Sequence, residues 1–171
     1  SGTTSIPFQN CGDLKYYEGH FYPTVEIAGD CWFSENCRYL PEVKDYSYIP
    51  INNGGQLAYS SNSIPYFYVY GYEGDYVVDA KATQTYIDYG ALYNFTSITT
   101  EAICPSGWHV ATELNFDNLV NSFGVPVSAY GYDSGDELKS VDWDGNNLSG
   151  FTGLGGGFIG YGSANAGYLG G

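Results

Sequence analysis

Short apolar segments rich in aromatic and β-branched residues, separated by turn residues, dominate the first half of the chain. Residues 16–22 and 24–30 are two such segments, and each contains a glycine next to a polar residue. The pattern predicts that they form the two arms of a β-hairpin, followed by a strand at Cys31–Phe33. A later strand is predicted at Pro65–Tyr70, before a turn at Glu73–Asp75.

Other stretches lack this regular pattern. Residues 41–65 contain scattered Asn, Gly, Ser and Pro, with the strongest turn signal at residues 52–55, and they predict a long loop. After Gly145 the chain is rich in glycine without an internal repeat, which predicts tight strands and turns rather than a linker. Residues 5–9 predict a short extended segment, and Pro7 within it suits an edge or an arm.

A first helix is predicted over residues 81–93. Tyr86, Tyr89 and Tyr93 lie at helical spacing and would share one face. Gly90 falls inside this range and lowers the helical propensity of the segment.

A second helix is predicted between Thr112, a good N-cap residue, and Gly124, which lies just past the expected end. The negative charge of Glu113 in the first turn interacts favourably with the positive, N-terminal end of the helix dipole. The residues on the apolar side are Leu114, Phe116, Leu119, Val120 and Phe123. A short helical turn is also predicted at residues 136–140.

Composition narrows the class of protein. The chain has 171 residues, 43% hydrophobic and 18% aromatic, which suffices for one domain with its own core. Five basic residues against 19 acidic ones give a net charge of −14, so nucleic acids and anionic membranes are not expected as partners. Charged residues amount to only 14%, while 19 Tyr and 24 Gly contribute to a neutral polar surface typical of secreted and cell-surface proteins.

The chain begins at Ser1 and contains no apolar segment near the roughly 20 residues needed to span a bilayer. We therefore expect a processed polypeptide that is secreted or displayed on the cell surface, without membrane insertion.

The four cysteines are Cys11, Cys31, Cys37 and Cys104, and their spacings match no zinc-binding pattern. Disulfides in an oxidising compartment are the better interpretation. Of the three connectivities, we favour Cys11–Cys31, which closes a local hairpin, with Cys37–Cys104, which ties the N-terminal half to the middle. Buried thiols in a cytosolic protein are the alternative.

Signals for catalysis and cofactor binding are weak. The chain has no Gly-x-Ser-x-Gly, no phosphate-binding glycine loop and no His-Glu-x-x-His, so we expect a non-enzyme without a cofactor. Asp142, Asp144 and Asn146 alternate as in some calcium loops, but Gly145 is misplaced for an EF-hand and no bidentate Glu follows. A solvated acidic turn without a metal is the better interpretation.

Several sequence blocks, taken in order, resemble the Fibrobacter succinogenes major paralogous domain, a bacterial and phage-borne extracellular module. The blocks occupy residues 19–27, 30–38, 89–95, 103–112, 138–140, 143–147, 149–151 and 154–157. The resemblance spans about residues 12–171. It implies an α+β fold similar to C-type lectins and to non-catalytic relatives of formylglycine-generating enzymes, with two helices, small twisted antiparallel sheets and long loops. Trp32, Trp108 and Trp143 would anchor the core, and disulfides would staple the loop-rich halves.

The chain departs from the family pattern in two ways. Members usually have Leu at the position of Cys37, and their cysteine in the block of Cys104 usually pairs near the C-terminus, where this chain has none. The chain also stops at Gly171, before the Trp-Ser-Ser-type strand and the closing strands of the family. Either the chain is a fragment, or the protein completes its sheet in another way.

A sheet without its last strands exposes unpaired backbone groups, which a neighbouring subunit could cover. Residues 1–10 form an uncharged extended arm outside the domain predicted for residues 11–171. The β-prone residues of this arm are Thr3, Thr4, Ile6 and Phe8. We therefore expect an extracellular structural subunit that self-associates into a fibre or adhesive appendage by strand addition. A flexible terminus is the alternative interpretation of the arm.

The competing hypothesis is a lectin-like module that binds a glycan or another cell-surface ligand. Aromatic segments at Tyr66–Tyr72 and Tyr130–Tyr132 could stack on sugar rings, although tyrosine also suits a sheet. Asn94 and Asn147 match the N-glycosylation pattern, a signal that chance readily produces, and either side chain could instead be structural.

Overall fold

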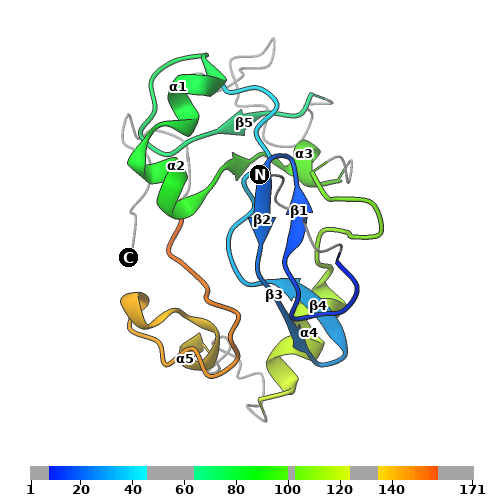
Figure 1. Cartoon of the computed structure of the whole chain (residues 1–171). Helices are drawn as coiled ribbons and strands as arrows, with labels where there is room; N and C mark the ends of the chain where they lie inside the picture. The colour runs from blue at the N-terminus through cyan, green and yellow to red at the C-terminus, as the bar shows by residue number, and fades with distance from the viewer. Residues whose placement is uncertain (1–7, 46–63, 100–102, 124–134, 158–171) are drawn as a thin grey trace, which may run out of the picture. The chain divides into compact units, whose positions relative to one another are not determined.

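The computed structural model describes residues 8–45, 64–99, 103–123 and 135–157 (Figure 1). Its mixed α and β structure with small antiparallel sheets agrees with the class predicted from the sequence. The chain divides into two compact units. The first unit comprises Ser1–Asn36 and Ala111–Leu154, and the second comprises Cys37–Val110 and Gly155–Gly171. The predicted division into an arm over residues 1–10 and one domain over residues 11–171 stays a prediction.

Four short strands form two hairpins in the first unit. They are β1 (Lys15–Tyr17), β2 (His20–Tyr22), β3 (Thr24–Ile27) and β4 (Asp30–Phe33), with β1 paired to β2 and β3 paired to β4. The prediction that residues 16–22 pair with residues 24–30 is therefore wrong, because each segment contains its own turn.

The two turns explain this local pairing. Glu18 and Gly19 have φ angles of 48° and 84°, and Ala28 and Gly29 have φ angles of 57° and 85°. Two consecutive residues with positive φ are typical of the two-residue turns whose twist matches that of antiparallel strands. Each glycine therefore reverses the chain within its segment.

The inner side of the first unit is aromatic. Tyr22 is fully buried and stacks on Phe33, with ring centroids 4.4 Å apart and an interplanar angle of 11°. Trp32 contacts the rings of Phe116 and Phe151 at 5.6 and 5.7 Å. These contacts join the strands to segments more than 80 residues away in the sequence.

The longest helix, α4 (Glu113–Asn121), begins where the sequence predicts. The Thr112 hydroxyl accepts a hydrogen bond from the Asn115 amide, and the Asn115 side chain accepts one from the amide of Thr112. This capping box satisfies two amides of the first turn. Leu119 and Val120 are buried, and the helix ends at Asn121 because Ser122 caps it before Gly124 is reached.

Two shorter helical elements follow in the first unit. They are α5 (Gly135–Leu138), close to the turn predicted at residues 136–140, and the 3₁₀ helix η1 (Val141–Trp143). A single parallel bridge joins Lys139 to Gly153. This bridge connects the residue that follows α5 to the glycine-rich segment.

Among its described residues, the second unit contains two short strands and three short helices. In chain order they are β5 (Phe67–Tyr68), α1 (Val77–Lys81), α2 (Gln84–Tyr89), β6 (Leu92–Tyr93) and α3 (Phe95–Thr99), and β5 pairs antiparallel with β6. The buried residues of its core are Leu40, Val43, Phe67, Val69, Ala80, Tyr86, Ala91 and Ile103. The strand predicted at Pro65–Tyr70 is thus present in shorter form.

The single helix predicted over residues 81–93 is wrong. Thr83 has an extended conformation and its hydroxyl caps α2, so a new helix begins after it. Gly90 has a φ angle of 74° and ends α2, after which Leu92 and Tyr93 form a strand. Of the three tyrosines whose spacing predicts one helix, Tyr86 and Tyr89 therefore lie in α2, whereas Tyr93 lies in β6.

The tryptophans lie at the borders of the described cores. Trp32, Trp108 and Trp143 are all half-buried. The largest fully buried side chains are Tyr22, Leu119, Val43, Val69 and Ser97. A side chain of this size is rarely enclosed completely, and the role of the three indoles as anchors of the core stays a prediction.

The capping box should contribute measurably to stability. Thr112→Ala is expected to lower the free energy of unfolding by about 1 kcal/mol, because the amide of Asn115 loses its acceptor. Urea denaturation followed by circular dichroism would measure the change. Asn118→Ala on the exposed side of the same helix is the matched control, for which no loss is expected. Equal losses in both variants would contradict the role of the cap.

Candidate functional site

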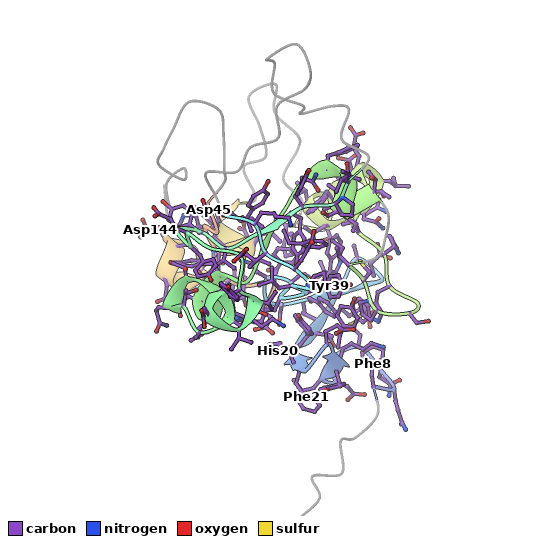
Figure 2. The ribbon with its side chains drawn as sticks, turned by 90° about the horizontal axis from the view of Figure 1, so that it is seen from above. Phe8, His20, Phe21, Tyr39, Asp45 and Asp144 are labelled. Atoms are coloured by element: carbon purple, nitrogen blue, oxygen red, sulfur yellow. A yellow bond between two sulfur atoms is a disulfide. The ribbon has the colours of Figure 1, made fainter. Side chains whose placement is uncertain are left out.

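An exposed apolar face on the β1–β2 hairpin is the most distinctive surface feature of the first unit. Tyr16 and Phe21 are direct cross-strand partners, with ring centroids 4.9 Å apart and exposures of 56% and 44%. Leu14 lies two residues before Tyr16 and is also exposed. We call these three residues the aromatic face. In Figure 2, Phe21 projects away from the ribbon of the hairpin.

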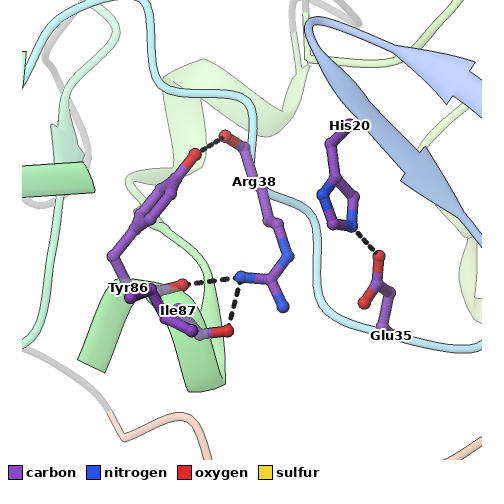
Figure 3. A network of polar contacts seen from close by, with 5 residues as sticks. All are labelled: His20, Glu35, Arg38, Tyr86 and Ile87. Carbon is purple, nitrogen blue, oxygen red and sulfur yellow. Dashed lines mark hydrogen bonds and ion pairs between the residues drawn. The ribbon is translucent and has the colours of Figure 1, made fainter. Parts of the chain in front are cut away.

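Alternation along the strands creates this face. In an antiparallel hairpin, neighbouring side chains point to opposite sides, so Tyr22 is buried while Phe21 is exposed. His20 lies on the same side as Tyr22 and contacts its ring edge-on at 4.7 Å. The His20 imidazole is also paired with the Glu35 carboxylate (Figure 3). One side of the hairpin is therefore fastened to its own unit, and the other side is presented outward.

The sheets in the described part of the chain are also small. Among the residues that the structure describes, each strand pairs with one neighbour only, which gives three two-stranded sheets. A strand that pairs on one side offers the backbone groups of its other side to a further strand. The aromatic face and an open edge therefore coincide on the β1–β2 hairpin.

The predicted arm is described only at its end. Thr3, Thr4 and Ile6 lie outside the described residues, whereas Phe8 is described and half-buried. The ammonium group of Lys15 lies 5.2 Å from the centre of the Phe8 ring. Phe8 thus contacts β1 of its own chain in this structure.

Arg38 holds the C-terminal end of α2 in the second unit. Its guanidinium donates hydrogen bonds of 2.7 Å to the carbonyl oxygens of Tyr86 and Ile87 (Figure 3). In return, the Tyr86 hydroxyl donates a hydrogen bond of 2.6 Å to the carbonyl oxygen of Arg38. A cation at this end of a helix interacts favourably with the negative end of the helix dipole, and the Tyr86 carbonyl oxygen also accepts a hydrogen bond from the amide of Gly90. The arrangement is structural.

Burial raises the pKa of the Tyr86 phenol above its ordinary value of 10.0. The positive charge of Arg38 opposes this effect, but burial is the larger cause. The phenol therefore stays protonated, and able to donate its hydrogen bond, at pH values where an exposed tyrosine has begun to ionise.

The aromatic segment predicted to bind sugars is mostly part of the core. Tyr66, Phe67, Tyr68 and Val69 are all buried, with exposures of 8% or less. A ring enclosed in this way cannot stack on a ligand, so most of Tyr66–Tyr72 is excluded as a stacking surface. Tyr130–Tyr132 lie outside the described residues.

Both asparagines of the glycosylation pattern use their side chains inside the fold. The Asn94 carbonyl oxygen accepts hydrogen bonds from the amides of Tyr66 and Ser97, and its amide group donates to the carbonyl oxygen of Ile64. Asn147 bonds Thr152 through both ends of its side chain. These contacts give each asparagine a structural role, and glycosylation of either stays a prediction.

The structure contains the disulfide Cys11–Cys31, which joins the N-terminal segment to β4. The Thr24 hydroxyl reinforces this join, because it accepts a hydrogen bond from the amide of Gly12 and donates one to the carbonyl of Asp13. The second bond of the favoured connectivity is not formed here, and Cys37 and Cys104 are thiols. The Cys37 thiol instead donates to the carbonyl oxygen of Ile103 at 3.8 Å.

The described residues contain no group of three or more His, Cys, Asp or Glu that could hold a metal ion. Asp144 follows η1 in a left-handed conformation, which is consistent with a turn. No helix in the described part of the chain is both long and apolar enough to cross a membrane.

The sequence interpretation missed the aromatic face. The feature of the sequence that could have revealed it is Glu18-Gly19. As a two-residue turn, this pair places Tyr16 opposite Phe21 on one side of a hairpin. Exposure itself could not be read from the sequence, since both sides of this hairpin carry aromatic residues.

A family model described as the Fibrobacter succinogenes major domain matches residues 25–168. The match covers most of the chain, including all five α-helices described here, and it confirms the resemblance inferred from the sequence blocks. No curated protein and no solved structure matches the chain. The aromatic face precedes the matched range, and the lectin-like topology stays a prediction.

The Tyr86 phenol should make stability depend on pH in the alkaline range. Its pKa is raised in the folded state, so the unfolded chain loses this proton first and the folded state loses stability as the pH rises above about 10. Tyr86→Phe is expected to cost about 1 kcal/mol at pH 7, because the hydrogen bond to Arg38 is lost. The difference from the unmodified chain should shrink above pH 10.

Urea denaturation at pH 7 to 11 would measure this difference, with Tyr16→Phe on the exposed face as the control. A Tyr86→Phe difference that stayed constant over this range would contradict the assignment.

Proposed function

The chain belongs to the Fibrobacter succinogenes major domain family, and we propose that it is a non-catalytic extracellular structural subunit that associates with copies of itself. The observation that carries this proposal is the aromatic face on a two-stranded hairpin with open edges. A second copy would add a strand to the open edge and cover Tyr16 and Phe21. Repeated head-to-tail contact of this kind builds a fibre.

Two energetic terms favour a protein partner that contributes a β-strand. An exposed edge offers main-chain hydrogen bonds, and the neighbouring rings offer apolar area that becomes buried only when another surface covers it. Tyrosine and phenylalanine are enriched in the buried centres of interfaces. The hairpin therefore supplies both the backbone and the side-chain parts of a strand-addition contact.

An extracytoplasmic location supports this role. The Cys11–Cys31 disulfide is of the kind that persists in oxidising compartments. A structural role outside the cell also agrees with the sparse charge of the surface, because only 14% of the residues are charged.

Glycan binding is the second candidate, and the geometry of the aromatic face favours it less. A sugar ring stacks on a flat aromatic surface, but the Tyr16 and Phe21 ring planes are inclined by 54°. Burial of Tyr66–Val69 removes the rings of that segment as a stacking surface. A glycan ligand would then have to bind through one ring at a time.

Self-association should depend on the aromatic face. Sedimentation velocity and electron microscopy of the chain at high concentration are expected to show oligomers or fibres. The double variant Tyr16→Ser with Phe21→Ser should weaken association by about tenfold or more, since central aromatic residues dominate interface energetics. Leu148→Ser removes a comparably exposed apolar side chain elsewhere in the same unit and should leave association unchanged. A monomer at every concentration would overturn the proposal.

Salt should strengthen the association. Each copy carries a charge of −14, so copies repel one another when the screening length is long. Raising the ionic strength from about 0.01 to 0.15 M shortens this length from about 30 to 8 Å. We expect more oligomer in the higher salt by sedimentation velocity. The opposite trend would indicate that charge pairs, rather than apolar and backbone contacts, hold the copies together.

A further inference from the structure

The Cys37 thiol contacts the backbone next to Cys104, although the two cysteines are 67 positions apart in the sequence. The Cys37 thiol donates to the carbonyl oxygen of Ile103 at 3.8 Å. That carbonyl belongs to the peptide group whose next α-carbon is the one of Cys104. The thiol of Cys37 is therefore directed at the backbone that carries the second cysteine.

The backbone of Cys37 is held in place from several sides. Its carbonyl oxygen accepts a hydrogen bond of 3.1 Å from the amide of Ala91. Gly90 packs so closely that a Cβ atom there would lie 2.5 Å from the same oxygen. The adjacent Arg38 is bound to α2 through its guanidinium and through the hydroxyl of Tyr86. Cys37 thus has little freedom to move away from the neighbouring segment.

The backbone of Cys104 is held by different contacts. Ile103 on one side is part of the buried core, and Cys104 itself packs against that core. Pro105 on the other side is buried and accepts a hydrogen bond of 2.9 Å from the amide of Trp108, which closes a turn. Once one of two cysteines held in this way forms a mixed disulfide with an oxidant, the thiolate of the other attacks it at a high effective concentration.

We propose that Cys37 and Cys104 form a second disulfide, which links the first residue of the second unit to the segment that follows α3. The structure, which has both thiols, represents the state before this covalent modification. The same oxidising compartment that maintains Cys11–Cys31 would favour it, and both cysteines are half-buried rather than enclosed. It is independent of the proposed self-association.

The chemistry is thiol–disulfide exchange with a small disulfide or an oxidoreductase disulfide as the oxidant. One cysteine thiolate attacks the oxidant, forms a mixed disulfide and releases one thiolate. The other cysteine thiolate then attacks the mixed disulfide at the first cysteine's sulfur and releases the second thiolate. The two cysteines lose two protons and two electrons, and the oxidant is reduced to two thiols.

The bond would stabilise the second unit mainly by restricting its unfolded state. It would close a loop from residue 37 to residue 104, and longer loops lose more entropy when they are closed. The folded state needs no large rearrangement, because the segments are already in contact. Oxidation should therefore change stability much more than it changes the fold.

The test uses the folded chain equilibrated with oxidised and reduced glutathione, followed by alkylation and peptide mapping by mass spectrometry. We expect a linked peptide pair that contains Cys37 and Cys104, and no alkylated thiol in the oxidised chain. Either variant, Cys37→Ser or Cys104→Ser, should leave one alkylated thiol while Cys11–Cys31 stays intact. The oxidised chain should melt on the order of 10 °C above the form with both thiols.

Two results would overturn the proposal. One is that both thiols remain open to alkylation under conditions that keep Cys11–Cys31 oxidised. The other is that the linked peptides come from two chains, which sodium dodecyl sulfate electrophoresis without reductant would show. A double Cys37→Ala, Cys104→Ala variant with an unchanged circular dichroism spectrum would verify that the reduced unit folds. If that variant unfolds, the alkylation and mapping of the unmodified chain still decide the matter.

Discussion

Side chains that bind backbone atoms hold this molecule together, because its regular structure is too short to do so alone. Every described sheet has two strands, and isolated two-stranded sheets are marginally stable in water. Asn94 is an example of a side chain that supplies the missing stabilisation. Its side-chain carbonyl oxygen and amide group bind the backbone of Tyr66 and Ile64 just before β5, and the Ser97 hydroxyl donates to the same oxygen.

The same principle recurs in both units. In the first unit, Thr24 binds the loop that carries Cys11, and Thr112 with Asn115 fixes the start of α4. In the second unit, Arg38 binds the end of α2. Each of these side chains satisfies backbone groups that a longer sheet or helix would pair internally. A chain with few charged residues and many hydroxyls and amides is suited to this mode of construction.

Short sheets also have a consequence for the surface. A long sheet would hide most of its strands between neighbours, whereas here each described strand pairs with one other strand. On the β1–β2 hairpin a strand edge lies beside Tyr16 and Phe21, so backbone and apolar groups are presented together. The short sheets of this fold thus create the surface on which the proposed assembly depends.

Local features of the sequence determined the start of α4, the strands at residues 31–33 and 67–68, and the Cys11–Cys31 disulfide. Each depends on residues close in the sequence: a cap before an apolar face for α4, turns beside the strands, and a local hairpin that brings the two cysteines together. The blocks that carry the family resemblance also belong to the sequence alone, and the family match confirms them.

The tertiary structure decided what local patterns leave open. Glu18-Gly19 and Ala28-Gly29 turned each predicted arm into its own hairpin, and Gly90 ended a helix that the tyrosine spacing alone would extend. Burial of Tyr66 and exposure of Tyr16 were equally undetermined, because the two side chains have the same chemistry. Which of them meets water depends on the segments that pack over it, and those segments are distant in the sequence.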